Sequence, residues 1–223
     1  MDDLKYLLQE FRNSEFDKKH KEKTMSISNE KDIQYVVMKK AYRDMMLRTI
    51  KKENENAAID EDKRDEILEW LSRKFVEFFK DKENIGDENF SKWHEKNCEE
   101  FLNKFNENIL KGKYRPIQFG KAQKIVNMAF KYLRCFDDAD EYLPFFVHCH
   151  MPIDSYMIEW YNKNDVGNGE KILCAWSNFS KSYYYDIQTQ IKCYCEKNHQ
   201  TPLETDFIEW KKIKEKEKKQ SKN

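Results

Sequence analysis

Two residues in the stretch 116–155, Lys124 and Asp154, carry side chains with complementary chemistry. Lys124 follows a short turn-like segment, and apolar residues recur at helical spacing after it. Asp154 follows a Pro-Ile dipeptide, and because proline fixes the backbone there, the aspartate is expected to begin a second helix. A lysine amine at the start of a buried helix, with a carboxylate delivered by another helix start, predicts covalent catalysis by an amine.

The order of these residues resembles the motif of the helix-hairpin-helix DNA glycosylases. In that superfamily a glycine hairpin precedes a lysine that opens a helix, and a Pro-hydrophobic-Asp turn follows. Gly120, Lys124 and Pro152-Ile153-Asp154 occur in this order. The 30-residue separation of the lysine and the aspartate is nearest the archaeal-type 8-oxoguanine DNA glycosylase branch. The resemblance covers residues 112–160, and only one glycine of the Gly-hydrophobic-Gly hairpin is present.

The resemblance implies a DNA glycosylase in which Lys124 and Asp154 are catalytic. Its substrate would be double-stranded DNA with a flipped base, either 8-oxoguanine-like or a hypermodified base of phage DNA excised in genome defence. A carboxylate near C1′ stabilises the positive charge that develops as the base leaves. A lysine can displace the base and form a Schiff base, with or without subsequent strand scission. We expect no cofactor, no metal site and no obligate protein partner.

Two sets of residues are expected to hold the DNA in this interpretation. Backbone contacts are expected from the hairpin amides and from the cations of a span, 112–132, that contains no acidic residue. These candidates are Phe119, Gly120, Lys121, Lys113, Arg115 and Lys131. A flipped base needs a stacking partner and polar groups that read its edge. The candidates, which the sequence does not rank, are Gln118, Asn127, Tyr132, His150 and Trp176.

Simpler interpretations of the same residues remain open. A lysine near a helix start is commonly a solvated charge, and Asp154 can be a helix cap alone. One alternative function is a helical interaction module or inhibitor without catalysis, in which Lys124 and Asp154 lie far apart on the surface. Another is a non-catalytic DNA-binding protein with the same fold. His148 and His150 could ligate a metal, but packing or pocket lining is the favoured interpretation.

Composition sets limits on these hypotheses. The 223 residues include 41 basic and 41 acidic side chains, so any DNA site must be a local patch. There is no apolar run of membrane-spanning length and no signal-peptide core at the N-terminus, so a cytoplasmic protein is expected. The six cysteines are scattered without C-x-x-C spacing and are expected to be free thiols.

The hydrophobic pattern predicts an all-α chain, a helix-hairpin-helix glycosylase-like domain with extra N-terminal helices. Expected helices cover the segment around Leu4–Phe11 and about 32–52, 62–80, 88–111, 121–136, 154–162, 170–177, 179–197 and 203–218. The expected organisation is an N-terminal helix and polar linker over 1–30, the helical domain over 31–210 and a basic tail over 211–223. The tail holds seven lysines and two glutamates.

Overall fold

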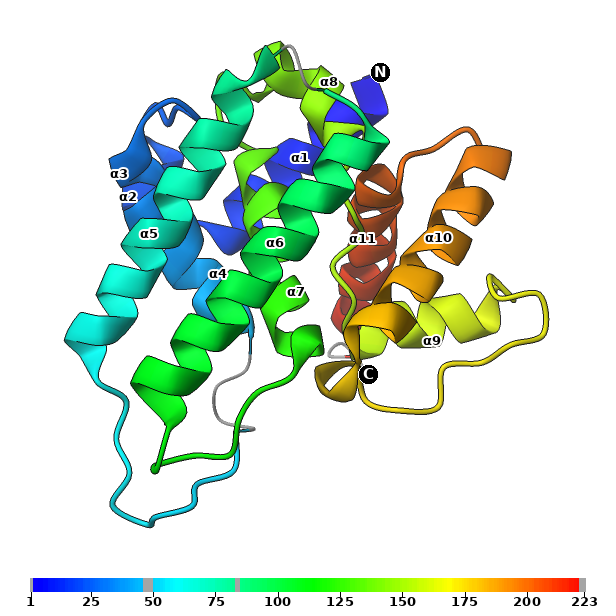
Figure 1. The fold of residues 1–223 in the computed structure, drawn as a ribbon. Coiled ribbons are helices and arrows are strands. Elements are labelled where there is room, and N and C mark those ends of the chain that lie inside the picture. Colours follow the sequence, from blue (N-terminus) through cyan, green and yellow to red (C-terminus); the bar gives the residue numbers. More distant parts are fainter. Residues whose placement is uncertain (1, 46–49, 83–84, 221–223) are drawn as a thin grey trace.

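The computed structural model describes residues 2–45, 50–82 and 85–220, and their regular structure is helical. Within those ranges the β-type pairings are two isolated bridges, Lys52 with Tyr114 and Gly167 with Glu170, and no strand is formed. The all-α prediction is confirmed. Figure 1 shows α7 (Phe119–Leu133) in the middle of the molecule, with other helices arranged around it.

The remaining elements lie on either side of α7 in the sequence. Those before α7 are α1 (Asp2–Glu15), α2 (Lys18–Lys21), α3 (Glu30–Asp32), the π-helical η1 (Ile33–Met38), α4 (Lys39–Asp44), α5 (Glu61–Lys80), α6 (Asp87–Phe105) and the π-helical η4 (Asn106–Leu110). Those after it are η5 (Ala139–Tyr142), α8 (Leu143–Phe146), α9 (Ser155–Lys163), η6 (Trp176–Asn178), α10 (Lys181–Lys197) and α11 (Pro202–Gln220).

Helix α7 is buried along its whole length, which explains its composition. Its apolar side chains fill the core, where Phe130 lies 4.7 Å from Phe75 and 5.6 Å from Phe78 between ring centroids. Its three lysines are buried as well, with at most 4% of each residue exposed. Because a buried charge is costly unless it is paired, each lysine must find a partner on a neighbouring element.

Gly120 permits the close contact between α7 and η6. A Cβ atom at this position would lie 1.8 Å from the carbonyl oxygen of Trp176, and the Gly120 N–H donates to Phe179 O at 3.1 Å. The glycine therefore belongs to the first turn of α7, not to a hairpin before it. Lys124 lies in the second turn of the helix, so the expectation that it opens the helix is wrong.

Several helix starts are explained by side-chain caps. Asp60 accepts a hydrogen bond from Lys63 N at 3.1 Å, and Asp154 accepts one from Met157 N at 3.0 Å. Such caps satisfy backbone N–H groups that have no partner within the helix. Gly86, not a side chain, occupies the cap position of α6. The side chain of Asp87, the first residue of α6, forms ion pairs with His148 and Lys192.

Two of the expected helices differ from those in the structure. The helix expected over 170–177 is absent except for the short η6, because the Asn162 side chain bonds both the N–H and the carbonyl of Ile172, at 2.9 and 3.0 Å. The helix expected over 32–52 ends at α4, and residues 46–49 lie outside the described part of the chain.

The segment expected as a polar linker is packed against the domain. Met25 and Ile27 are fully buried, and their backbone N–H groups donate to the carboxylates of Asp137 and Asp138. Arg12 of α1 adds an ion pair with Asp137 at 2.8 Å. The acidic loop after α7 therefore fastens the N-terminal segment to the core.

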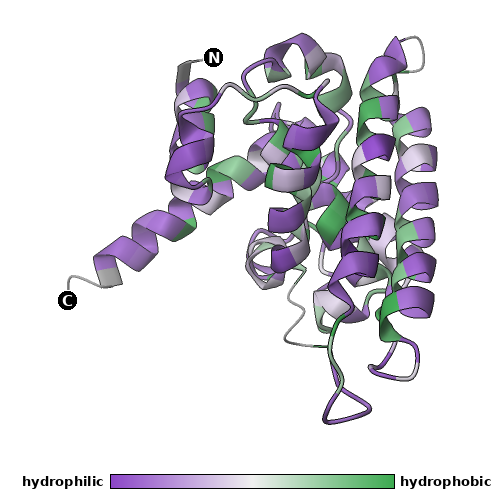
Figure 2. Ribbon diagram, turned by 90° about the vertical axis from the view of Figure 1, so that its left-hand side faces the viewer, coloured by the Kyte–Doolittle hydropathy of each residue, from purple (hydrophilic) through white to green (hydrophobic). Residues whose placement is uncertain are grey.

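The expected basic tail continues α11 as far as Gln220. In Figure 2 the last turns of this helix extend away from the rest of the molecule. Among the described residues, no helix is both long enough and apolar enough to cross a membrane.

Candidate active site

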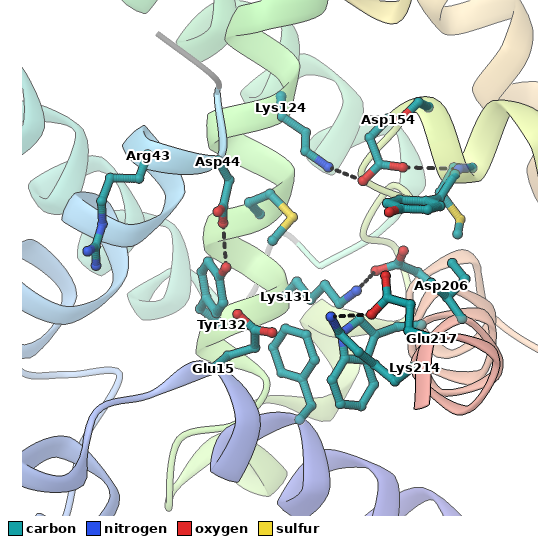
Figure 3. A pocket seen from close by; sticks show the side chains of 17 residues that line it. Glu15, Arg43, Asp44, Lys124, Lys131, Tyr132, Asp154, Asp206, Lys214 and Glu217 are labelled. Atoms are coloured by element: carbon teal, nitrogen blue, oxygen red, sulfur yellow. Dashed lines mark hydrogen bonds and ion pairs between the residues drawn. The ribbon is translucent and has the colours of Figure 1, made fainter. Parts of the chain in front are cut away.

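The structure brings Lys124 and Asp154 into direct contact. Lys124 Nζ lies 2.9 Å from Asp154 Oδ2, and the two side chains are 5% and 30% exposed. The second carboxylate oxygen of Asp154 accepts the Met157 N–H at the start of α9. The cap thus orients the carboxylate, and the buried helix α7 positions the amine (Figure 3).

The electrostatics of this pair keep Asp154 ionised. Burial raises the pKa of Asp154, but the Lys124 ammonium and the hydrogen bonds from Lys124 and Met157 outweigh it, and the pKa lies below its ordinary value. At neutral pH the carboxylate can therefore hold the amine in place and oppose a positive charge that develops nearby.

The pair lies on the wall of an open cavity of about 710 Å³. The cavity is enclosed by α7 and parts of α1, α4, α9 and α11. Aromatic side chains contribute to its wall, namely those of Phe11, Tyr132, Tyr156 and Trp210. Its size is within the range of sites that bind drug-sized ligands, and the aromatic surface suits a flat ligand.

A second lysine–aspartate pair lies deeper in the same wall. Lys131 Nζ is 2.5 Å from Asp206 Oδ2, and both side chains are 5% exposed. Burial raises the pKa of Asp206, with Lys131 opposing the shift. Lys131 was expected to contact DNA phosphates, but it is buried and neutralises a carboxylate of α11, with its ammonium 4.8 Å from the Phe11 ring centroid.

Tyr132 and Asp44 form a third polar contact on the cavity wall. The Tyr132 hydroxyl donates to Asp44 Oδ2 (Figure 3). Burial raises the pKa of Asp44, and burial also raises that of Tyr132 well above its usual value. Tyr132 was among the residues named for the base pocket, and it lines this cavity.

The phosphate-binding site expected at the hairpin is not formed. Phe119 and Gly120 are buried, and the Gly120 amide already donates to Phe179. Lys121 Nζ donates to Met45 O at 2.8 Å and lies 5.1 Å from the Trp176 ring centroid. Burial lowers the pKa of Lys121 to about 8. Phe119, Gly120 and Lys121 are therefore buried in the protein interior and are not available to a phosphate.

Lys113 and Arg115 lie on the loop before α7. Their backbones bond to the segment 51–53, with Arg115 N donating to Lys51 O and Glu53 N donating to Lys113 O, both at 2.9 Å. Neither residue lines the cavity that contains Lys124. The structure therefore separates the expected cationic patch into buried lysines and a distant loop.

The other base-pocket candidates are also elsewhere. Gln118 precedes α7 as its cap residue, and Trp176 is packed against Gly120. Asn127 and His150 belong to a separate buried network, and none of the four lines the cavity. The sequence showed the residue types but not the side of the helix on which they lie.

This buried network is ordered by its hydrogen bonds. His94 Nε2 is 2.9 Å from Asn127 Oδ1, which can only accept, so His94 donates there and its Nδ1 accepts from the Tyr185 hydroxyl. Tyr184 accepts from Asn127 Nδ2, so its hydroxyl can donate to His150 Nδ1. Burial lowers the pKa of His94 to about 3 and that of His150 well below its ordinary value.

The two histidines considered as metal ligands do not converge. His148 binds Asp87 at 2.7 Å, whereas His150 binds Tyr184. Across residues 2–45, 50–82 and 85–220, no group of three or more His, Cys, Asp or Glu side chains is arranged to hold a metal ion.

Sequence reasoning missed several residues of the cavity wall, which come from separate elements: Asp44, Tyr156, Asp206 and Trp210. The one available signal was Asp206, which stands beside Phe207 on the apolar face of α11. An acidic residue at a core position needs a partner. Comparisons with protein-family models, with curated proteins and with solved structures give no match for this chain.

Proposed function

We propose that this protein is a DNA glycosylase that excises a damaged or modified base, with Lys124 as nucleophile. The observation that carries the proposal is the position of Lys124 Nζ, 2.9 Å from Asp154 Oδ2 on the wall of an open cavity of about 710 Å³. The base would be 8-oxoguanine-like or a hypermodified base of phage DNA. In this proposal η4, the loop 111–118 and α7 correspond to the helix-hairpin-helix element.

The proposed reaction transfers two of the three protons of the Lys124 ammonium and leaves the third on the nitrogen. Lys124 passes one proton to Asp154, and its free electron pair attacks C1′ of the nucleotide. The bond from C1′ to the base breaks, and the base leaves with the bonding electrons and takes a proton from the attacking nitrogen. The nitrogen then forms a double bond to C1′ as the bond from C1′ to O4′ breaks, and Asp154 returns its proton to O4′. The products are a Lys124 iminium, free base and ionised Asp154.

Asp154 has a second part in this reaction. As the bond from C1′ to the base begins to lengthen, positive charge develops on the sugar while Asp154 is still ionised. The carboxylate, held by a helix start, stabilises this charge before it accepts the proton of Lys124. The aromatic wall of the cavity offers stacking surface for the flipped base. The iminium also acidifies C2′, so elimination of the 3′-phosphate can follow as a lyase step.

An excision assay tests the proposal. Duplexes that carry 8-oxoguanine or modified cytosines are incubated with the wild-type protein, with Lys124→Arg and with Asp154→Asn. Arginine keeps the positive charge but forms no Schiff base, and asparagine keeps the helix cap. We expect base release by the wild type and none by Lys124→Arg. Equal release by both proteins, or release by neither, contradicts the proposal.

The assay also separates the alternatives. Duplex binding without base release would indicate a non-catalytic DNA-binding protein. Absence of both would favour an interaction module, although that hypothesis expects Lys124 and Asp154 far apart and they are 2.9 Å apart.

A further inference from the structure

A second groove adjoins the cavity that contains Lys124. It has a volume of about 810 Å³, and Glu15 and Arg43 line both hollows. The groove lies between the end of α1, α2, η1, α4 and α5. Figure 3 shows Arg43 pointing away from the Lys124–Asp154 pair, so it marks the border between the two hollows. A ligand seated in the cavity can therefore extend past Arg43 into the groove.

The groove is cationic in a protein whose formal net charge is zero. Its lining contains Lys39, Lys40, Arg43 and Arg64. The same lining contains two carboxylates, of which one, Glu15, is bound to Lys40 at 2.9 Å. This is a local concentration of positive charge, which a neutral protein needs if it is to bind a polyanion.

Arg43 differs from the other three cations. Lys39 lies 3.7 Å from Asp65 and Arg64 lies 2.8 Å from the same carboxylate. Arg43 is exposed, and within the described part of the chain no carboxylate lies within ion-pair distance of it. Its guanidinium is therefore available to an anion, and it can present a planar pair of donors to a phosphate.

Two tyrosines of the groove point to the same class of ligand. Tyr42 is 5% exposed, and its hydroxyl has no hydrogen-bond partner among the described residues. A buried hydroxyl without a partner is costly, and a phosphate oxygen would satisfy it. Tyr35 is 54% exposed, with Lys39 Nζ 5.2 Å from its ring centroid. An exposed aromatic ring beside cations is suited to a strand whose bases can stack.

We propose that this groove binds the sugar–phosphate backbone of the DNA strand whose base enters the cavity. The assignment of the ligand as DNA rests on the proposed function; the position of the groove does not. In this arrangement Arg43 contacts the phosphate next to the flipped nucleotide, and Lys39 and Tyr35 contact the strand further along. The backbone track thus runs over η1 and α4, not over the start of α7.

Binding without chemistry tests the proposal. The probe is a fluorescent duplex carrying a tetrahydrofuran abasic analogue, which cannot form a Schiff base, and anisotropy is measured between 50 and 200 mM salt. We expect Arg43→Glu to weaken binding about tenfold or more at 50 mM salt. We expect Arg43→Ala to reduce the slope of log K against log salt by about 0.9, the value for one phosphate contact. Tyr42→Phe removes only the hydroxyl and is expected to weaken binding about threefold.

The control is Lys92→Glu, which changes an exposed lysine of α6 that lines neither hollow. We expect its affinity to stay within about twofold of the wild type, since it only tests the change in net charge. Equal affinities for Arg43→Glu and Lys92→Glu, or no binding by the wild type at 50 mM salt, would contradict the proposal that the groove binds DNA. If binding depends on the groove residues but no base is excised, the proposed glycosylase function is contradicted. The proposal that the groove binds DNA is then supported.

Discussion

At the scale of single residues, the Asp154 carboxylate has two separable roles. One oxygen caps α9 through Met157 N, and the other holds Lys124. Asparagine supports a helix cap about as well as aspartate does, whereas alanine does not. Substitution by asparagine or by alanine therefore separates the two roles.

For the proposed catalytic role, we expect Asp154→Asn to slow base release by roughly 10²-fold or more, because the negative charge opposite C1′ is lost. Its melting temperature should stay nearer the wild type than that of Asp154→Ala, which also loses the cap at a cost of about 1 kcal/mol. Single-turnover kinetics and thermal unfolding measure both. Full activity in Asp154→Asn would show that the carboxylate acts only as a cap.

The buried ion pair between Lys131 and Asp206 leads to a prediction about stability. Lys131→Met leaves Asp206 buried without its cation and is expected to cost about 3–5 kcal/mol of unfolding free energy. The double variant Lys131→Met/Asp206→Leu removes both charges and should lose less than the single variant. Urea unfolding measures this difference. A double variant less stable than Lys131→Met would show that the pair contributes more than mutual neutralisation.

At the scale of elements, the contact between α7 and η6 depends on Gly120. Gly120→Ala would place Cβ 1.8 Å from a backbone oxygen of Trp176, and a backbone atom cannot rotate away as a side chain can. We expect a loss of about 2 kcal/mol or more of unfolding free energy, since overpacking of this kind strains the backbone. Ala122→Gly, two residues further along α7, is the comparison for helix propensity and one buried methyl group, which account for about 1 and about 0.8 kcal/mol. Gly120→Ala proteins as stable as the wild type would contradict the described packing.

The elements also show what a sequence can and cannot predict. The helix cores were predictable because apolar residues recur at helical spacing, as in α5 and α6. The missing helix over 170–177 was not predictable, because a side chain from α9, Asn162, takes the backbone bonds of Ile172. The packing of 17–30 was missed for a similar reason: its polar backbone is bound by Asp137 and Asp138, more than a hundred residues away.

For the site, pairing Lys124 with Asp154 needed a resemblance, not a local pattern. The burial of Lys121 and Lys131 was unpredictable, because their partners are the Met45 carbonyl and Asp206, both distant in the chain. A run of cations on a helix is ordinarily solvated, and only the tertiary structure shows that this helix is enclosed.

At the scale of the whole molecule, the buried histidines make stability depend on pH. His94 and His150 are held neutral in the folded protein, with the pKa of His94 lowered to about 3 by burial. In the unfolded chain a histidine binds a proton below about pH 6.5. The unfolded state then binds more protons than the folded state, so the free energy of unfolding falls as pH decreases from about 6.5 towards 3.

The expected slope is up to about 1.4 kcal/mol per pH unit for each of these histidines. Urea unfolding between pH 7 and 5 measures it, since most carboxylates remain ionised there. His94→Gln keeps an amide that can donate to Asn127 but does not titrate. The slope of its unfolding free energy against pH should therefore be smaller by the contribution of one histidine. An equally steep decline in this variant would mean that other groups carry the pH dependence.

Schiff-base trapping shows directly whether the Lys124 amine is the nucleophile. The protein is incubated with abasic-site duplex and borohydride, and the modified peptide is identified by mass spectrometry. The matched variants are Lys124→Arg and Lys131→Arg, two buried lysines that line the same cavity and are each paired with an aspartate. We predict a covalent adduct on Lys124 that is lost in Lys124→Arg and retained in Lys131→Arg. No adduct, or an adduct that persists in Lys124→Arg, would contradict the account.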